Sequence, residues 1–249
     1  MSTVHCPLPA VLDALRVEIA PGPPPAPTDA MLARWDTLRA RTPRLFNGPI
    51  LAFVGYDHAT RVVHARRDRY MRLACQDERD PPEVMLLGVT ALLIAPGPDT
   101  VPRVMLGKRS REVWACPGLW EFGPAGGLSA PGVFDHDAPA TITGAAVLDH
   151  LLREIREETG IAEPPARASV ECLTIDREGR GADIVIRAEF ERPPETLART
   201  DAPDSWEYDE TRWLTFHETA AFARTRGDEM IAPTRAIGRR LVEGLGIGD

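Results

Sequence analysis

The sequence is poor in the features that mark several large classes of protein. Its four cysteines are scattered, with no C-x-x-C pair, which disfavours both a zinc knuckle and a disulfide framework. Lysine and arginine total 29 against 37 aspartates and glutamates, a formal charge of −8. The chain therefore lacks the basic surplus that is typical of proteins that bind nucleic-acid polymers. A small phosphate ligand stays compatible with this charge, because a few local cations can meet it.

Long apolar runs and targeting segments are missing as well. No stretch approaches the roughly 20 apolar residues that a membrane-spanning helix needs. The first residues do not combine a basic start with an apolar run, the pattern of a secretory signal peptide. We therefore expect a reduced, cytoplasmic setting, with neither a membrane nor a nucleic-acid polymer as partner. The sequence gives no indication of the oligomeric state.

Proline is abundant, with 24 residues, and it helps to divide the chain. The run from Pro21 to Pro27 favours an extended form, so we expect a tether there. Residues 28–42 predict a helix, because apolar residues recur at helical spacing after the capping candidates Thr28 and Asp29. Three runs rich in strand-forming residues follow and predict a small antiparallel meander: ILAFVGYD, TRVVHARRD and RYMRLACQ.

The rest of the chain alternates expected strands and helices. An apolar strand near Val84–Pro96 leads through a hairpin into RVMLGKRS, and a second hairpin turns at REGRG. The segment DETRWLTF reads as a strand before helices near His217–Thr225 and Ile231–Leu245. These elements predict an α+β fold, an α/β/α sandwich. We expect an N-terminal extension over residues 1–83 and a catalytic domain over residues 84–249.

The segment LREIREETGI is the strongest single feature of the sequence. On a helix, Glu154, Glu157 and Glu158 fall at i, i+3 and i+4, so three carboxylates share one face. Like charges at this spacing repel one another, and a cation among them would offset the repulsion. Hard oxygen ligands suit Mg²⁺, or Mn²⁺ in its place, rather than zinc. Gly160 can end the helix in the left-handed conformation.

A helix rich in arginine and glutamate is more often just a solvated face with i,i+4 ion pairs. The surroundings favour the functional interpretation here. Arg153 directly precedes the first glutamate, and Ile155 and Ile161 supply apolar positions. A Gly126-Gly127 pair lies upstream, after WEFGPA.

With these residues the chain resembles the Nudix hydrolase family, whose signature is G-x(5)-E-x(7)-R-E-U-x-E-E-x-G-U, with U aliphatic. Residues 153–161, REIREETGI, match every fixed position of its C-terminal half. PGLWEFGPAGG resembles the strand and loop that enter this box, and YDETRWLTFHE resembles the late strand of the family. The likeness covers roughly residues 85–245 and implies the Nudix fold, with the N-terminal helix and meander added.

Two departures from the family pattern stand out. Counted from Gly127, the signature places its arginine at position 141, whereas Arg153 lies twelve residues further on. The insert contains turn-forming residues and the cluster Asp135-His136-Asp137, for which a polar surface loop is the simpler interpretation than a metal or ligand site. At the position eight before Arg153, where the family has its first glutamate, this chain has Ala145.

The resemblance implies metal-dependent hydrolysis of a nucleoside diphosphate linked to another moiety. Glu157 and Glu158 are the expected metal ligands, and Glu154 is a third ligand or orients the attacking water. Arg153 is expected to hold these carboxylates, and Gly126 and Gly127 to let the backbone approach the site. Lys108, Arg109 and Arg111 are candidates to meet substrate phosphate, with ordinary surface charge as the alternative. Glu207 and Glu210 are candidates for a late acid that joins the site, with a solvated loop acid as the simpler interpretation of each.

The segment RWDTLRARTPRLFNGPIL, followed by the expected meander with RYM, resembles a Nudix subgroup with a similar N-terminal extension. That subgroup includes hydrolases of UDP-glucose and UDP-galactose. This likeness implies a UDP-sugar as substrate, giving UMP and a sugar 1-phosphate. Two alternatives stay open. In the first alternative, the substrate is ADP-ribose, a dinucleotide or coenzyme A. In the second, the chain is a catalytically weak nucleotide-binding or regulatory module, as Ala145 and the insert suggest.

Overall fold

The computed structural model describes residues 3–6, 8, 11–42, 45–76, 82–129, 132–135 and 137–243. The chain forms two compact units that interleave along the sequence. The first unit consists of Met1–Val89, Gly127–His150 and Val170–Ile184, and the second of Thr90–Gly126, Leu151–Ser169 and Val185–Asp249. Each unit combines three separate segments of the chain, whereas the boundary predicted after residue 83 divides the sequence into two consecutive parts. That boundary stays a prediction.

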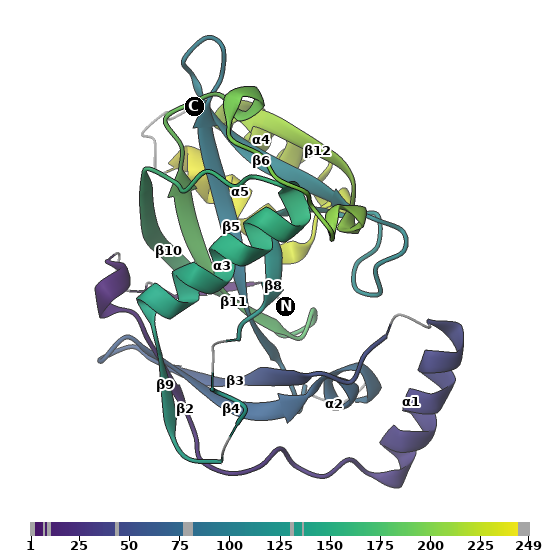
Figure 1. Ribbon diagram of the computed structural model, residues 1–249. Coiled ribbons are helices and arrows are strands. Elements are labelled where there is room, and N and C mark those ends of the chain that lie inside the picture. The colour runs from purple at the N-terminus through teal and green to yellow at the C-terminus, as the bar shows by residue number, and fades with distance from the viewer. Residues whose placement is uncertain are drawn as a thin grey trace. The chain divides into compact units, whose positions relative to one another are not determined.

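The first unit contains a group of four strands: β2 (Arg16–Ile19), β3 (Pro49–Asp57), β4 (Val62–Arg69) and β9 (Ala140–Thr143). Strands β3 and β4 form the predicted antiparallel hairpin, β4 pairs with β2 in parallel, and β2 pairs with β9 antiparallel (Figure 1). Strand β9 lies in the insert before Arg153, where the sequence indicated turns. The end of the insert is therefore a strand of this sheet.

Strand β1 (Val4–Cys6) joins the first unit by pairing antiparallel with β10 (Arg167–Asp176), Val4 opposite Ile175. Strand β11 (Gly181–Glu189) lies next to β10 and completes the predicted hairpin. Both β10 and β11 pass from one unit to the other along their length.

Helix α1 (Asp29–Arg41) confirms the first predicted helix. Its first turn is capped by Thr28, whose Oγ1 accepts a hydrogen bond from the backbone N–H of Met31 at 3.2 Å. Trp35 is the buried residue of this helix, and it packs in a cluster with Leu45 and with side chains of the helix that follows β4. Burial of one aromatic side chain thus fixes an otherwise solvated helix to the unit.

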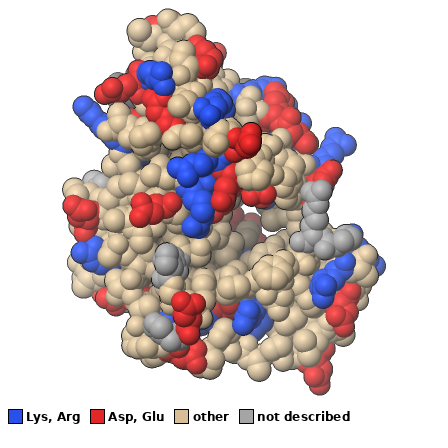
Figure 2. Space-filling model, viewed as in Figure 1, with Lys and Arg blue, Asp and Glu red and all other residues tan. Residues whose placement is uncertain are grey.

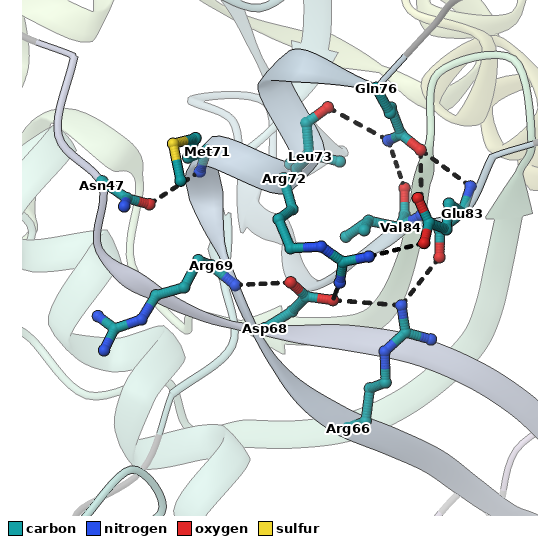
Figure 3. A network of polar contacts seen from close by, with 10 residues as sticks. All are labelled: Asn47, Arg66, Asp68, Arg69, Met71, Arg72, Leu73, Gln76, Glu83 and Val84. Carbon is teal, nitrogen blue, oxygen red and sulfur yellow. Dashed lines mark hydrogen bonds and ion pairs between the residues drawn. The ribbon is translucent and has the colours of Figure 1, made fainter. Parts of the chain in front are cut away.

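The run Arg69–Gln76, predicted as the third strand of a meander, contains the helix α2 (Tyr70–Cys75), so that prediction is wrong. A buried polar network explains the helix (Figure 3). Asp68 has no exposed surface and forms an ion pair with Arg72 at 2.7 Å. A strand would separate these two residues by about 13 Å, whereas one helical turn brings them together. Asn47 adds a hydrogen bond from Met71 N to its Oδ1 at 2.9 Å.

The second unit is built around strand β6 (Pro102–Arg109). One edge of β6 pairs antiparallel with β12 (Tyr208–Thr215). The other edge pairs first with the end of β5 (Leu86–Pro96) and then with β7 (Trp120–Phe122). Helices α4 (Phe216–Thr225) and α5 (Ala232–Glu243) pack on one another and contact these strands (Figure 1). A capping box between Thr215 and Glu218 begins α4.

Strands and helices together confirm the predicted α+β class. The strand near 84–96, both hairpins and both closing helices are present, and the predicted end at Leu245 lies outside the described residues. In the described part of the chain, no helix has the length and apolar character to cross a membrane. Acidic and basic side chains are intermingled on the face shown in Figure 2.

Candidate active site

Helix α3 (Gly144–Thr159) carries the predicted carboxylates on its C-terminal half, in the second unit. Leu151 and Ile155 are almost fully buried and fix this half of the helix to the core. Gly160 ends the helix with φ of 72°, which confirms the predicted left-handed residue. A Cβ added at Gly160 would lie 2.7 Å from the carbonyl oxygen of Thr200, so space as well as backbone angle requires glycine here.

Glu158 is the most buried of the three glutamates, with only 6% of its surface exposed. Its Oε2 atom has no hydrogen-bond partner among the described residues. Burial raises the pKa of this carboxyl well above its ordinary value, and the charges of Glu207, Glu121 and Glu154 raise it further. A buried carboxylate oxygen without a donor has a high free-energy cost, which a bound cation would offset.

Glu154 lies against the glycine-rich loop. A Cβ added at Gly126 would lie 2.8 Å from Glu154 Oε2, so the missing side chain makes room for the carboxylate. Burial and the charge of Glu157 raise the pKa of Glu154 to about 7. The charge of Arg153 opposes this shift; its Nη2 lies 3.9 Å from Glu154 Oε1, and its side chain is 48% exposed.

The late loop brings a fourth carboxylate to the same place. The backbone N–H of Asp204 donates to the carbonyl oxygen of Glu157 at 3.0 Å, which fixes the loop to the end of α3. Burial raises the pKa of Glu207, and the charge of Arg109 opposes this effect. Of the two predicted late acids, Glu207 therefore lies within the electrostatic reach of Glu158. Glu210 instead pairs with Arg212 at 2.6 Å on an exposed surface.

Glu121 is a site residue that the sequence did not reveal. It is 3% exposed on β7, and its Oε1 lies 2.6 Å from Arg109 Nη1. Burial raises the pKa of Glu121, although the charge of Arg109 opposes that rise. Arg109 also donates from Nε to the carbonyl oxygen of Ala115 at 2.9 Å. Its guanidinium is thus held inside the protein, while its predicted role toward substrate phosphate stays a prediction.

Tyr208 is the second residue that the sequence did not reveal as part of the site. Its hydroxyl donates a hydrogen bond to Glu121 Oε1 at 3.2 Å. Burial raises the pKa of the phenol well above its ordinary value, and the charges of Glu121 and Glu158 act in the same direction. The side chain of Tyr208 thus remains a protonated donor between two carboxylates. Only its position before the DETRW strand signalled it.

Two other predicted site residues, Lys108 and Gly127, have different neighbours. Lys108 is opposite Trp120 and Glu210 in the strand register, while its neighbour Arg109 lies on the other face of β6. Gly127 belongs to the first unit, where a Cβ would contact Leu86 at 3.4 Å. Ala145 is exposed at the start of α3. Of the cluster at 135–137, His136 lies outside the described residues.

The acidic cluster, defined as Glu121, Glu154, Glu157, Glu158 and Glu207, fits a hard divalent cation in its chemistry. Its donors are all carboxylate oxygens, and one buried oxygen lacks a partner. Burial and mutual repulsion raise the pKa of several members, which is the effect expected when like charges crowd without a counter-ion. Within the described residues, however, no three acidic, histidine or cysteine side chains converge closely enough to hold a metal ion as they stand.

No family model and no curated protein matches the sequence. Solved structures do show similarity. A Nudix hydrolase from Alicyclobacillus acidocaldarius is 14% identical, over 64% of this chain and 91% of that one, with a TM-score of 0.46. The MutT protein from Methanosarcina mazei is 18% identical, over 65% and 95% of the two chains, with a TM-score of 0.43.

A third structure is a bifunctional NMN adenylyltransferase/ADP-ribose pyrophosphatase from Francisella tularensis, complexed with AMP and a manganese ion. It is 17% identical over 68% of this chain and 43% of that one, with a TM-score of 0.40. At this identity and these TM-scores, the similarities establish neither a family nor an activity. The function must therefore be inferred from the residues of the acidic cluster.

Proposed function

We propose that this protein is a Nudix-type hydrolase that uses a divalent metal ion to cleave a nucleoside diphosphate linked to another moiety. One observation carries the proposal: the REIREETGI segment forms a helix end that gathers buried and half-buried carboxylates, one of which has an oxygen without a partner. A solvated Arg/Glu face would instead expose Glu154 and Glu158 and would not raise the pKa of either carboxyl. Mg²⁺ is the proposed ion, with Mn²⁺ as its substitute.

Glu154, Glu157 and Glu158 are the proposed ligands of the ion, and Glu207 is a further candidate. When bound, the ion would neutralise the pyrophosphate oxygens and lower the pKa of a bound water. The proposed role of Glu154 is that of a third ligand or of the group that orients the attacking water.

Arg153 is the proposed partner that restrains Glu154, and its Nη2 atom lies 3.9 Å from Glu154 Oε1. Gly126 allows the loop backbone to approach the carboxylate closely. Lys108, Arg109 and Glu210 remain proposed contacts for substrate, together with Gly127. Arg109 would need to leave Glu121 to reach a phosphate directly, so we assign it chiefly to holding Glu121.

For the substrate, we propose a UDP-sugar that yields UMP and a sugar 1-phosphate, and the support is the likeness of the N-terminal extension to that Nudix subgroup. ADP-ribose, dinucleotides and coenzyme A form the alternative class. A catalytically weak nucleotide-binding module is the other alternative, favoured by Ala145. Against that alternative, a cluster of buried and half-buried carboxylates is costly in free energy unless a cation offsets the burial and the mutual repulsion of the charges.

The test is turnover of a substrate panel in the presence of Mg²⁺. The protein is incubated with UDP-sugars, ADP-ribose, dinucleotides and coenzyme A, and phosphate is measured after coupling to a phosphatase. Glu157→Gln should lower kcat by at least about a hundredfold, whereas the exposed Glu171→Gln serves as a matched control. Equal activity in both variants contradicts the metal assignment. Tight nucleotide binding without turnover of any compound favours the regulatory module.

A further inference from the structure

Tyr208 reaches the acidic cluster because of an irregularity in strand β12. In the β12–β6 register, Thr211 lies opposite Gly107 and Glu210 opposite Lys108, yet Tyr208 lies opposite Arg109. One extra residue, Asp209, is therefore accommodated as a β-bulge. Without the bulge, position 208 would face the opposite side of the sheet, because side chains alternate along a strand. The bulge turns Tyr208 onto the face that carries Arg109.

Two glycines provide the space for the tyrosine ring on that face. A Cβ at Gly107 would lie 2.4 Å from Tyr208 Cε1, and a Cβ at Gly123 would lie 2.2 Å from Tyr208 Oη. Neither glycine has a positive φ, so backbone conformation does not require glycine at these positions. Close packing against the ring and its hydroxyl is what excludes a side chain there.

The hydroxyl lies between two buried carboxylates. It donates to Glu121 Oε1 at 3.2 Å, and it also hydrogen-bonds with Glu158, which lowers the pKa of that carboxyl against the larger effect of burial. Tyr208 as a residue is partly exposed, but its hydroxyl end is buried. A phenol has a single proton, so it can donate to one of the two carboxylates at a time.

The partners of Glu121 make this sharing asymmetric. Glu121 already accepts from Arg109 at 2.6 Å, whereas Glu158 Oε2 has no partner among the described residues. Glu121 therefore keeps a hydrogen bond from Arg109 even when it loses the one from the Tyr208 hydroxyl. The hydroxyl can therefore turn to the carboxylate of Glu158 while Arg109 continues to neutralise Glu121.

We propose that Tyr208 is a positioning residue that orients the carboxylate of Glu158 for the cation. This inference rests on the proposed function, since it assumes that Glu158 is a metal ligand. The bulge, the two glycines and the Arg109–Glu121 pair together form the support of the tyrosine. Outer groups that orient metal ligands typically change metal affinity by 10–100-fold when they are removed.

The experiment measures Mn²⁺ binding to the full chain by the electron paramagnetic resonance signal of the free ion. Tyr208→Phe removes only the hydroxyl, and Tyr56→Phe, on β3 of the first unit, removes a hydroxyl far from the cluster in sequence and is the matched control. We expect Tyr208→Phe to weaken Mn²⁺ binding about tenfold or more and Tyr56→Phe to leave it unchanged. In turnover assays the metal concentration for half-maximal rate should rise, while kcat at saturating metal recovers most of its value.

A double-mutant cycle with Gly123→Ala tests the geometry separately. The added methyl group should clash with the Tyr208 hydroxyl and destabilise the protein, and Tyr208→Phe should relieve most of that effect. Gly123→Ala alone should also weaken Mn²⁺ binding, even though the tyrosine is present. Equal Mn²⁺ affinity in Tyr208→Phe and the unaltered protein overturns the inference and leaves the proposed function intact. Absence of Mn²⁺ binding by the unaltered protein overturns both.

Discussion

The Nη1 atom of Arg109 lies 2.6 Å from Oε1 of Glu121, and this pair joins strand β6 to strand β7 inside the second unit. Both side chains are largely removed from solvent, at 15% and 3% exposure. An exposed pair would contribute little, but loss of one partner here leaves a buried charge without a counter-charge. The acidic cluster should therefore depend on this pair for its stability.

Replacement of Arg109 should destabilise the protein strongly. We expect Arg109→Met to lower the free energy of unfolding by about 3–5 kcal/mol, because Glu121 is left buried without a counter-charge. Urea unfolding followed by circular dichroism measures this change. The exposed neighbour Arg111→Met is the control and should change stability by less than about 0.5 kcal/mol. Equal effects of the two substitutions would show that the pair is not structurally important.

Glu154 should make the stability of the metal-free protein depend on pH. Its pKa is raised to about 7, so between the ordinary value of 4.5 and 7 the folded state holds a proton that the unfolded state has lost. Stability should therefore fall as pH rises through this window, by about 1–2 kcal/mol after allowance for partial exposure. Unfolding in chelator at several pH values measures the slope. Glu154→Gln should reduce it, and an unchanged slope in that variant would refute the assignment.

Glu158 should couple stability to the metal ion. In metal-free protein, Glu158→Gln removes a buried carboxyl whose pKa is raised, so stability should stay the same or increase by about 1 kcal/mol. Mg²⁺ at a hundred times its dissociation constant should stabilise the unaltered protein by about 2.7 kcal/mol. The Glu158→Gln variant should lose most of this gain. Thermal unfolding with and without Mg²⁺ distinguishes the two effects, and an equal gain in both proteins would contradict the assignment of Glu158 as a ligand.

Arg67 should hold the insert in place within the first unit. It is 3% exposed and donates to the carbonyl oxygens of Val133, Ala20 and Ala138 at 2.6, 3.1 and 2.8 Å. Arg67→Met should lower stability by about 2–3 kcal/mol, because one buried and two part-buried carbonyl acceptors lose their donor. Amide hydrogen exchange should speed up in peptides from residues 132–143. The exposed Arg69→Met is the control, and similar exchange in both variants would count against this role.

The sequence predicted the parts of the site that depend on local pattern. The spacing of the glutamates placed them on α3, and Gly160 ended that helix as its residue type requires. Thr28 likewise capped α1 as expected. In each case the deciding interaction lies within a few residues along the chain, so the pattern carries enough information.

The parts that escaped prediction depend on contacts between distant residues. The run at Arg69–Gln76 has the composition of a strand, and the buried Asp68–Arg72 pair made it a helix instead. The local sequence does not distinguish Glu121 from an ordinary strand residue, because its partner Arg109 lies on the neighbouring strand β6. Tyr208 joined the site only through the bulge at Asp209. A local pattern cannot reveal a buried polar partner that lies far away in the sequence.

The pairing of β2 with β9 has a consequence for the order in which the chain can fold. Val17 of β2 pairs with Ile142, and Val4 of β1 pairs with Ile175. Both N-terminal strands therefore have a partner that is synthesised more than a hundred residues later. The nascent first unit therefore emerges from the ribosome with unpaired strand edges, which are prone to associate with other chains. Such long-range pairings also slow folding in a topology-dependent way. The proline-rich run Pro21–Pro27 then follows strand β2, whose edge partner β9 has not yet been synthesised.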